Sequence, residues 1–211
     1  DETRQVTIGD MNGDGFLDII AANIGEKNRV FYNDGNGQFE KFTSFGASFD
    51  KTMSIALGDL DGDGDLDIVT GNNGSKNHYY INNESSFKLN HFSENDKVTY
   101  GITLGDLNND GYLDVVVGVT RADPYYEGAY IQILINNGSG ELIDETASRF
   151  NNQVRATSHH GEGNIYLRDM NLDGILDIVH STRDFQSNYH GAHIAINDGS
   201  GNFQSLPNSV L

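Results

Sequence analysis

Residues 58–67 read Gly58-Asp59-Leu60-Asp61-Gly62-Asp63-Gly64-Asp65-Leu66-Asp67, and closely similar acidic stretches occur at 9–18, 105–114 and 168–177. Counted from its first Asp, each copy has oxygen-bearing side chains at positions 1, 3, 5 and 9, and Gly at position 6. Internal repeats of this kind indicate a fold that uses one structural unit several times. The four copies therefore predict a protein of four repeated units.

The pattern of oxygen atoms predicts a calcium loop. Calcium takes six to eight oxygen ligands at about 2.3–2.6 Å, and Gly at position 6 permits the sharp turn that brings them together. Position 7 varies because only its backbone carbonyl is expected to bind. We predict one Ca2+ per unit, up to four in all, and the following ligands. They are Asp10, Asn12, Asp14, Phe16 and Asp18; Asp59, Asp61, Asp63, Asp65 and Asp67; Asp106, Asn108, Asp110, Tyr112 and Asp114; and Asp169, Asn171, Asp173, Ile175 and Asp177.

An EF-hand shares the opening of this motif but requires a bidentate Glu at position 12 and helices on both sides. Position 12 is occupied here by Ala21, Thr70, Val117 and His180. The residues after each ninth-position Asp, such as Ile68-Val69, are typical of a strand. The sequence therefore favours a calcium loop between two strands.

The repeat continues beyond the loop. An alternating apolar strand precedes each loop, a second strand follows it, and a third strand ends in Asn33, Asn82, Asn136 or Asn197. A Gly- or Asn-rich turn and a fourth strand complete the unit. Four strands per unit and no helical period predict an all-β fold, a β-propeller of four-stranded antiparallel blades, rather than a sandwich or solenoid. We expect a single domain over 1–211, with units near 1–49, 50–96, 97–150 and 151–211. A closed four-bladed ring is favoured, and the alternative is an arc of a larger seven-bladed propeller.

Charge and composition limit the possible partners. The chain has 13 Lys and Arg against 31 Asp and Glu, a formal net charge of −18, and no Cys. Binding of nucleic acid requires a basic face on the protein, so nucleic acid is excluded as a partner. The sequence contains no run of about 18 apolar residues, so no membrane insertion is predicted. Without metal the carboxylates within each acidic loop repel one another, so calcium binding is expected to stabilise the folded protein. Calcium loops of this kind suit extracellular or periplasmic calcium levels better than cytosolic ones, which predicts one of those locations.

The motif Gly-Asp-x-[Asn/Asp]-x-Asp-Gly-x-Leu-Asp, together with the hairpin Asn-[Asp/Asn]-Gly-x-Gly-x-Phe, resembles the FG-GAP/VCBS repeat family, which includes the integrin α-subunit propeller. The resemblance covers all four units and implies calcium in the hairpin between the first two strands of each blade. Members of the family usually close with seven blades. The fourth unit departs from the pattern, with Arg168 in place of the leading Gly and Leu172 at position 4, and the second unit has a shortened turn.

Three long connections are expected on the face opposite the calcium loops, at 119–128, 144–163 and 181–191. Long loops that carry aromatic and charged groups on a rigid scaffold are common binding sites. The residues predicted to bind a ligand there are Arg121, Tyr125, Tyr126, His159, His160, Arg183, Tyr189 and His190.

Three functions fit these residues. The favoured one is a recognition or adhesion module for a glycan or protein partner, in which aromatic faces stack on sugars and Arg hydrogen-bonds them. The second is a polysaccharide lyase, in which Tyr189, His190 or His160 removes the proton next to a uronate carboxylate and Arg183 neutralises that carboxylate. The third is a structural scaffold or spacer. Further domains of a longer chain are compatible with all three.

Overall fold

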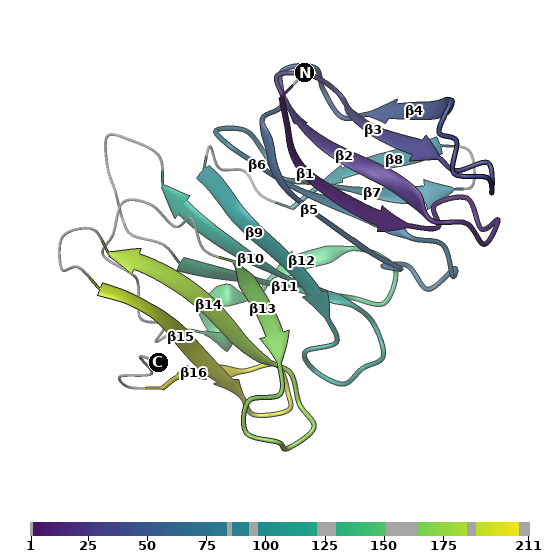
Figure 1. Ribbon diagram of the computed structural model, residues 1–211. Helices are drawn as coiled ribbons and strands as arrows, with labels where there is room; N and C mark the ends of the chain where they lie inside the picture. Colours follow the sequence, from purple (N-terminus) through teal and green to yellow (C-terminus); the bar gives the residue numbers. More distant parts are fainter. Residues whose placement is uncertain are drawn as a thin grey trace.

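The structure, a computed structural model, describes residues 2–83, 86–92, 97–121, 130–150, 164–184 and 189–206 (Figure 1). Within these ranges the chain forms sixteen strands and one four-residue helix, α1 (Thr146–Arg149). The fold is all-β, as predicted from the sequence. None of the described helices has the length and apolar character needed to cross a membrane.

The strands form four four-stranded sheets, each made of consecutive strands in chain order. The first sheet contains β1 (Glu2–Gly9), β2 (Asp18–Ile24), β3 (Asn28–Tyr32) and β4 (Lys41–Phe45). The second contains β5 (Thr52–Gly58), β6 (Asp67–Asn72), β7 (His78–Asn83) and β8 (Ser86–His91). The third contains β9 (Lys97–Gly105), β10 (Asp114–Arg121), β11 (Tyr130–Asn136) and β12 (Leu142–Asp144). The fourth contains β13 (Ile165–Arg168), β14 (Asp177–Asp184), β15 (Tyr189–Asn197) and β16 (Phe203–Ser205).

Every pair of neighbouring strands is antiparallel, which confirms the predicted repeat of four-stranded blades. The first strands of successive sheets pack against one another, β1 on β5, β5 on β9 and β9 on β13, and so form the inner edge of the molecule. The sheets follow one another in an open row, with the first and the fourth at opposite ends (Figure 1). The closed four-bladed ring that the sequence favoured is therefore not formed, because each sheet turns too little relative to the last for four to complete a circle.

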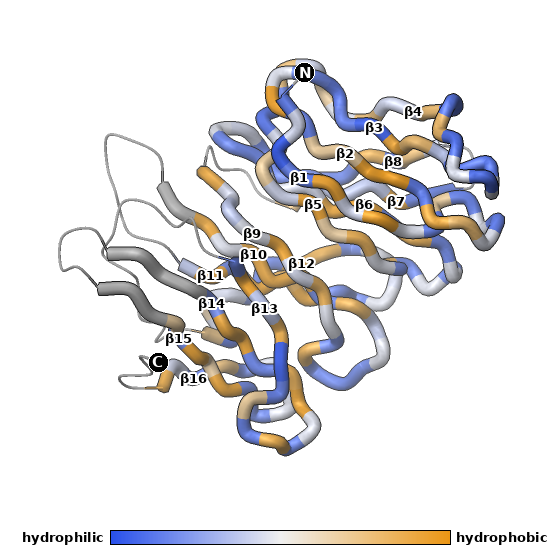
Figure 2. The backbone as a smooth tube through the Cα atoms, viewed as in Figure 1, coloured by the Kyte–Doolittle hydropathy of each residue, from blue (hydrophilic) through white to orange (hydrophobic). Residues whose placement is uncertain are grey.

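The hydrophobic core lies between neighbouring sheets, in three separate clusters. Ile20 and Ile68 belong to the cluster between the first and second sheets, Val69 and Val115 to the next, and Val116 and Ile178 to the last. Each of these side chains is fully buried. Hydrophobic residues follow the strands, whereas the loops at the strand ends are mainly hydrophilic (Figure 2).

Buried polar side chains also join the sheets at the ends remote from the acidic loops. Asn28 Nδ2 donates to Thr52 Oγ1 at 3.0 Å, from the first unit to the second. Asn77 Nδ2 donates in the same way to Thr99 Oγ1 at 2.8 Å, from the second unit to the third. These bonds lie in a water-poor interface, where an unpaired partner would be costly, so they fix how one sheet sits on the next.

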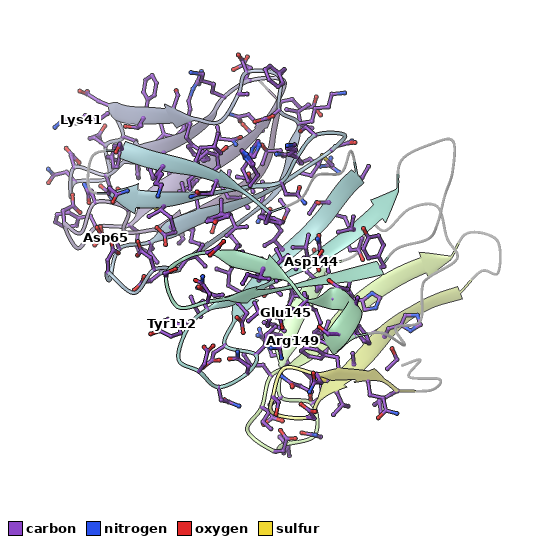
Figure 3. The ribbon with its side chains drawn as sticks, turned by 180° about the vertical axis from the view of Figure 1, so that it is seen from behind. Lys41, Asp65, Tyr112, Asp144, Glu145 and Arg149 are labelled. Carbon is purple, nitrogen blue, oxygen red and sulfur yellow. The ribbon has the colours of Figure 1, made fainter. Side chains whose placement is uncertain are left out.

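Helix α1 follows β12 and packs against β11 of the third sheet. Asp144, just before the helix, accepts a hydrogen bond from the backbone N–H of Thr146 at 3.0 Å. Arg149 Nε donates to Glu145 Oε2 at 2.7 Å, and these side chains gather beside the helix in Figure 3. The helix thereby brings Phe150 into the core between the third and fourth sheets.

Candidate functional site

The four acidic loops each join the first strand of a sheet to the second, as predicted. In the second loop, Asp59 Oδ1 accepts a hydrogen bond from Gly62 N at 2.7 Å, and its Oδ2 accepts one from Gly64 N at 2.9 Å. The first Asp of each other loop also accepts a bond from the position-6 Gly, at 2.8–2.9 Å. The loops are therefore held in one shape by their own backbone amides.

The second loop contains a compact acidic cluster. Asp59, Asp61 and Asp67 each offer a carboxylate oxygen, and these oxygens lie within 4.8 Å of one another. Two oxygens bound to one calcium ion are at most about 5 Å apart, and calcium prefers oxygen ligands, so both the spacing and the donor type fit this metal. Burial raises the pKa of Asp67 to about 6, and burial followed by repulsion from Asp63 raises the pKa of Asp61. A cation in this loop would relieve both effects.

The other three loops have an amide at position 3. Asn12 Nδ2 donates to Asp14 Oδ2 at 2.9 Å, and Asn108 and Asn171 donate to Asp110 and Asp173 at 2.9 and 2.8 Å. In these three loops the Asn gives the loop a lower negative charge than the second loop has, and it holds the position-5 carboxylate by a hydrogen bond. The second loop is consequently the one with the highest charge and the strongest expected attraction for a cation.

The ninth-position Asp has a structural role that the sequence analysis did not anticipate. Asp18, Asp67, Asp114 and Asp177 are all fully buried. In Asp67, Oδ2 accepts from Leu60 N at 2.7 Å and Oδ1 accepts from Asn82 N at 2.7 Å, so the carboxylate joins the loop to the end of the third strand. The same two bonds occur in the other three units, at 2.9 or 2.8 Å. Each carboxylate retains further lone pairs for a metal.

The side chain at position 7 also has a structural role, although only its carbonyl was expected to matter. A Cβ atom at Gly138 would lie 2.8 Å from the ring of Tyr112, so that ring rests on the turn between β11 and β12. Phe16 lies against Gly35 and Ile175 against Gly199 in the same way. Tyr112 and Asp65, the position-7 residues of the third and second loops, lie toward the same edge of the molecule in Figure 3.

Position 4 of every loop has a positive φ angle. Gly13 and Gly62 adopt 70° and 81°, and Asn109 adopts 59°. Leu172 adopts 63° in the fourth loop, where a non-glycine residue with a Cβ costs about 1–2 kcal/mol. The departure noted in the sequence therefore places backbone strain in the fourth loop.

A second candidate site lies on the inner edge, in the half of the strands remote from the loops. A groove of about 380 Å³ is lined by residues of β1, β5 and β9 and by the start of β13, including Arg4, Met53, Tyr100 and Tyr166. The strand pairing shifts register at Arg4, Met53 and Tyr100, which occupy the same position in three successive units. Such β-bulges redirect side chains, so the repeat places three side chains into one groove.

Two exposed side chains of the groove suit a polar ligand. Arg4 and Tyr166 are exposed, and among the described residues Arg4 forms no ion pair. The hydroxyl of Tyr100 is buried and has no hydrogen-bond partner within the described ranges, and burial raises the pKa of Tyr100 above its usual value. The groove thus combines an exposed guanidinium with the exposed side chain of Tyr166, whereas the hydroxyl of Tyr100 is turned against Gly118 and closed off from the surface.

The residues predicted to bind a ligand are only partly placed. Tyr125, Tyr126, His159 and His160 lie outside the described residues. Arg121 ends β10, opposite Lys97 of β9. Much of 181–191, expected as a loop, is strand: β14 runs to Asp184 and β15 begins at Tyr189. Arg183 pairs with His190, and Tyr189 with Asp184, so the backbone does bring Arg183, Tyr189 and His190 to one end of the fourth sheet.

Two further histidines lie on the same pair of strands. His180 of β14 and His193 of β15 are direct cross-strand partners, and their rings stack with centroids 5.3 Å apart. His180 is buried, and its Nδ1 has no partner within the described part of the chain. Burial, and then the neighbouring His193, lower the pKa of His180 to about 4, and burial lowers the pKa of His193. This pair is therefore neutral at pH 7 and contributes packing rather than charge.

Repeated four-stranded sheets with an acidic loop between their first two strands define a repeat protein of β-propeller-like blades. The FG-GAP-like repeat family matches residues 10–70 and 59–117, which together cover more than half of the chain, and the chain belongs to that family. No curated protein matches the chain.

Solved structures show a similar fold at low sequence identity. A lectin from Agrocybe aegerita that recognises non-reducing terminal N-acetylglucosamine is 19% identical, with a TM-score of 0.55 over 95% of this chain and 51% of the lectin. BBS1N, solved in complex with ARL6DN, is 15% identical, with a TM-score of 0.59 over 97% of this chain and 56% of that one. The V. cholerae biofilm matrix protein Bap1 is 18% identical over 98% of this chain and 40% of Bap1, with a TM-score of 0.44. This chain spans about half the length of the first two.

Proposed function

We propose that this chain is a calcium-binding part of an extracellular or periplasmic β-propeller that recognises a glycan or a protein partner. The proposed calcium binding rests on the cluster of Asp59, Asp61 and Asp67 in the second loop. Hydrogen bonds from backbone amides of the same loop fix its conformation. The same loop geometry in the other units supports up to four sites. A bound calcium ion would neutralise the loop carboxylates and add stability in proportion to its binding.

The second loop offers a direct test of calcium binding. In the Asp61→Ala variant a carboxylate of the cluster is lost, whereas in Asp65→Ala the backbone carbonyl expected to bind at position 7 is kept. Isothermal titration of chelator-treated protein with Ca2+ should show one site fewer, or that site weakened about 10- to 100-fold or more, for Asp61→Ala alone. Asp65→Ala is expected to keep the wild-type stoichiometry. Equal titrations for wild type and Asp61→Ala would contradict a site at this loop.

The recognition half of the proposal rests on the groove of the inner edge. Aromatic rings stack on sugar faces, while guanidinium and hydroxyl groups hydrogen-bond their polar substituents, so the exposed side chains of Arg4 and Tyr166 suit a glycan. The similarity in fold to the Agrocybe aegerita lectin supports the glycan as the partner.

Glycan recognition is tested by screening the calcium-loaded chain against a glycan array and then titrating the best ligand. The Arg4→Ala/Tyr166→Ala variant should lose about tenfold or more in affinity, because exposed anchors in a groove carry much of the binding energy. Phe49→Ser is the matched control, since Phe49 is 78% exposed and is absent from the groove lining. Unchanged affinity of the double variant for the glycan would contradict the groove as the binding site. If the array retained no glycan at all, a protein partner would be favoured. Shortening of a bound polysaccharide would instead support the lyase hypothesis.

A further inference from the structure

A pair of histidines lies across the last two strands of the second sheet, at the end remote from its acidic loop. His78 begins β7, and its direct partner in the register is His91, the last residue of β8. Their rings have centroids 5.8 Å apart and an interplanar angle of 61°. His78 is half-buried, whereas His91 is exposed. The sheet thus holds two side chains together that can each offer a ring nitrogen to one ion.

The spacing of the two rings matches that of two imidazoles bound to one metal ion. A Zn–N bond of about 2.0–2.1 Å places the ion roughly 3.2 Å from the centroid of each ring. For angles at the ion from tetrahedral to about 130°, the two centroids are therefore about 5.2–5.8 Å apart. The 5.8 Å between His78 and His91 lies within that range. Because His91 is exposed, its ring can also turn toward an ion without displacing core side chains.

Two oxygen atoms lie beside Nδ1 of His78. Asp50 Oδ2 is 3.8 Å and the Tyr80 hydroxyl oxygen 3.4 Å from this nitrogen. A carboxylate beside Nδ1 favours the tautomer that carries its proton there, which leaves the lone pair on Nε2. A carboxylate behind one nitrogen of a histidine is the usual arrangement when the other nitrogen binds a metal, because it orients the ring and raises its basicity. Nε2 is therefore the nitrogen of His78 that suits a metal.

Asp50 is itself fixed in place. The residue is 3% exposed, and its Oδ2 accepts a hydrogen bond from Ala47 N at 3.0 Å. Its backbone carbonyl accepts another from Gly25 N at 2.8 Å, so the turn that carries Asp50 is joined to the first sheet. A carboxylate held in this way can orient His78 before any ion arrives.

The histidine pair does not belong to the pattern that recurs in every unit. In the first unit the equivalent cross-strand pair is Arg29 with Ser44. In the fourth unit His193 occupies the position of His78, four residues before the third-strand Asn, but its ring contacts His180 on the strand before it. The packing of the repeat therefore does not require histidine at either place in the second unit.

The chemistry of the pair differs from that of the acidic loops. Burial lowers the pKa of His78, so its imidazole is neutral at pH 7. Neutral imidazole nitrogens suit Zn2+, Cu2+ and Ni2+, whereas Ca2+ prefers oxygen ligands. An ion held here would be bound in addition to calcium in the loops.

We propose that His78 and His91 bind one divalent transition-metal ion of the class that prefers imidazole nitrogen, with Asp50 as the positioning residue behind His78. Zn2+ is the probe of this site. Water completes the coordination, since two nitrogens leave part of the usual four positions open.

Isothermal titration with Zn2+ in saturating Ca2+ tests the proposal. His91 is exposed at a strand end, so His91→Gln should stay folded, which circular dichroism checks. The His91→Gln variant should bind one Zn2+ fewer than the wild type, or bind it at least about tenfold more weakly. Asp50→Asn should keep the wild-type stoichiometry and weaken this site about 10- to 100-fold. With Cu2+ in place of Zn2+, electron paramagnetic resonance should show coupling to two imidazole nitrogens in the wild type and in Asp50→Asn, and to one in His91→Gln.

Two control variants keep the assignment specific. Lys88→Gln changes an exposed residue of the same strand, and His193→Gln removes the equivalent histidine of the fourth unit; both should titrate like the wild type at this site. A folded His91→Gln variant that binds as much Zn2+ as the wild type with equal affinity overturns the proposal. So does a loss of the site in His193→Gln but not in His91→Gln, or a Cu2+ spectrum of the wild type without nitrogen coupling.

Discussion

The Asp114→Ala variant is expected to lose about 4 kcal/mol of unfolding free energy, even when calcium is absent. Asp114 is fully buried, and its two carboxylate oxygens accept hydrogen bonds from Leu107 N at 2.9 Å and Asn136 N at 2.8 Å. Without the carboxylate, both buried amides lose their acceptor, at about 1–3 kcal/mol each. Urea denaturation in the presence of a chelator measures this loss separately from any loss of metal binding.

Two variants of the same loop serve as controls for Asp114→Ala. Asp114→Asn keeps the shape and one acceptor oxygen, so about half of the loss should be recovered. Asp110→Ala removes an exposed carboxylate that binds only amides within the loop and should cost less than about 1 kcal/mol. If Asp114→Ala and Asp110→Ala were equally stable in chelator, the ninth-position Asp would be a metal ligand without the structural role assigned to it.

The Asn136→Ala variant should lose about 3 kcal/mol, because it breaks the contact between the second and third sheets. Asn136 is 1% exposed, and its Nδ2 donates to Leu60 O at 2.6 Å and to Leu113 O at 3.1 Å. The substitution leaves the buried carbonyl of Leu60 without its donor and opens a small cavity between the sheets. The measurement is again urea denaturation, with the m-value used to check that unfolding stays cooperative.

Asn33→Ala is the matched control for Asn136→Ala, because Asn33 holds the same position in the first unit but contacts no preceding unit in this structure. Within the described part of the chain its Nδ2 donates only to Leu17 O, at 3.2 Å, and the residue is half-buried. Its loss should be about 1 kcal/mol or less. Equal losses at Asn33 and Asn136 would show that this Asn stabilises its own hairpin and does not join the units.

The repeat architecture could be predicted from the sequence because its signals are local. Alternating strands, the acidic loop and the Asn-Gly turns each depend on residues close together in the chain, and the strands and the loop recur in all four units. The oxygen atoms of Asp59 and Asp61 could likewise be assigned to one loop, because a tight turn brings alternate side chains to the same side. These features require no knowledge of how the sheets pack.

The groove of the inner edge could not be predicted in this way. It depends on β-bulges at Arg4, Met53 and Tyr100, three residue types with no common chemistry, and on the packing of the inner strands of successive sheets. The extended strands that carry Arg183 and His190 were also missed, since their residues have the polar composition of a loop. Their cross-strand pairing becomes visible only in the register of β14 and β15.

By itself the sequence determined the four-stranded repeat, the positions of the acidic loops and the oxygen donors in them, because backbone turns and alternating strands are encoded within a few residues. Only the tertiary structure decided that the row of sheets is open, that the ninth-position Asp also joins the loop to the third strand, and that the third-strand Asn connects neighbouring units. Those roles depend on contacts between residues far apart in the chain, such as Asn197 with Leu107, and such contacts arise only when whole sheets pack.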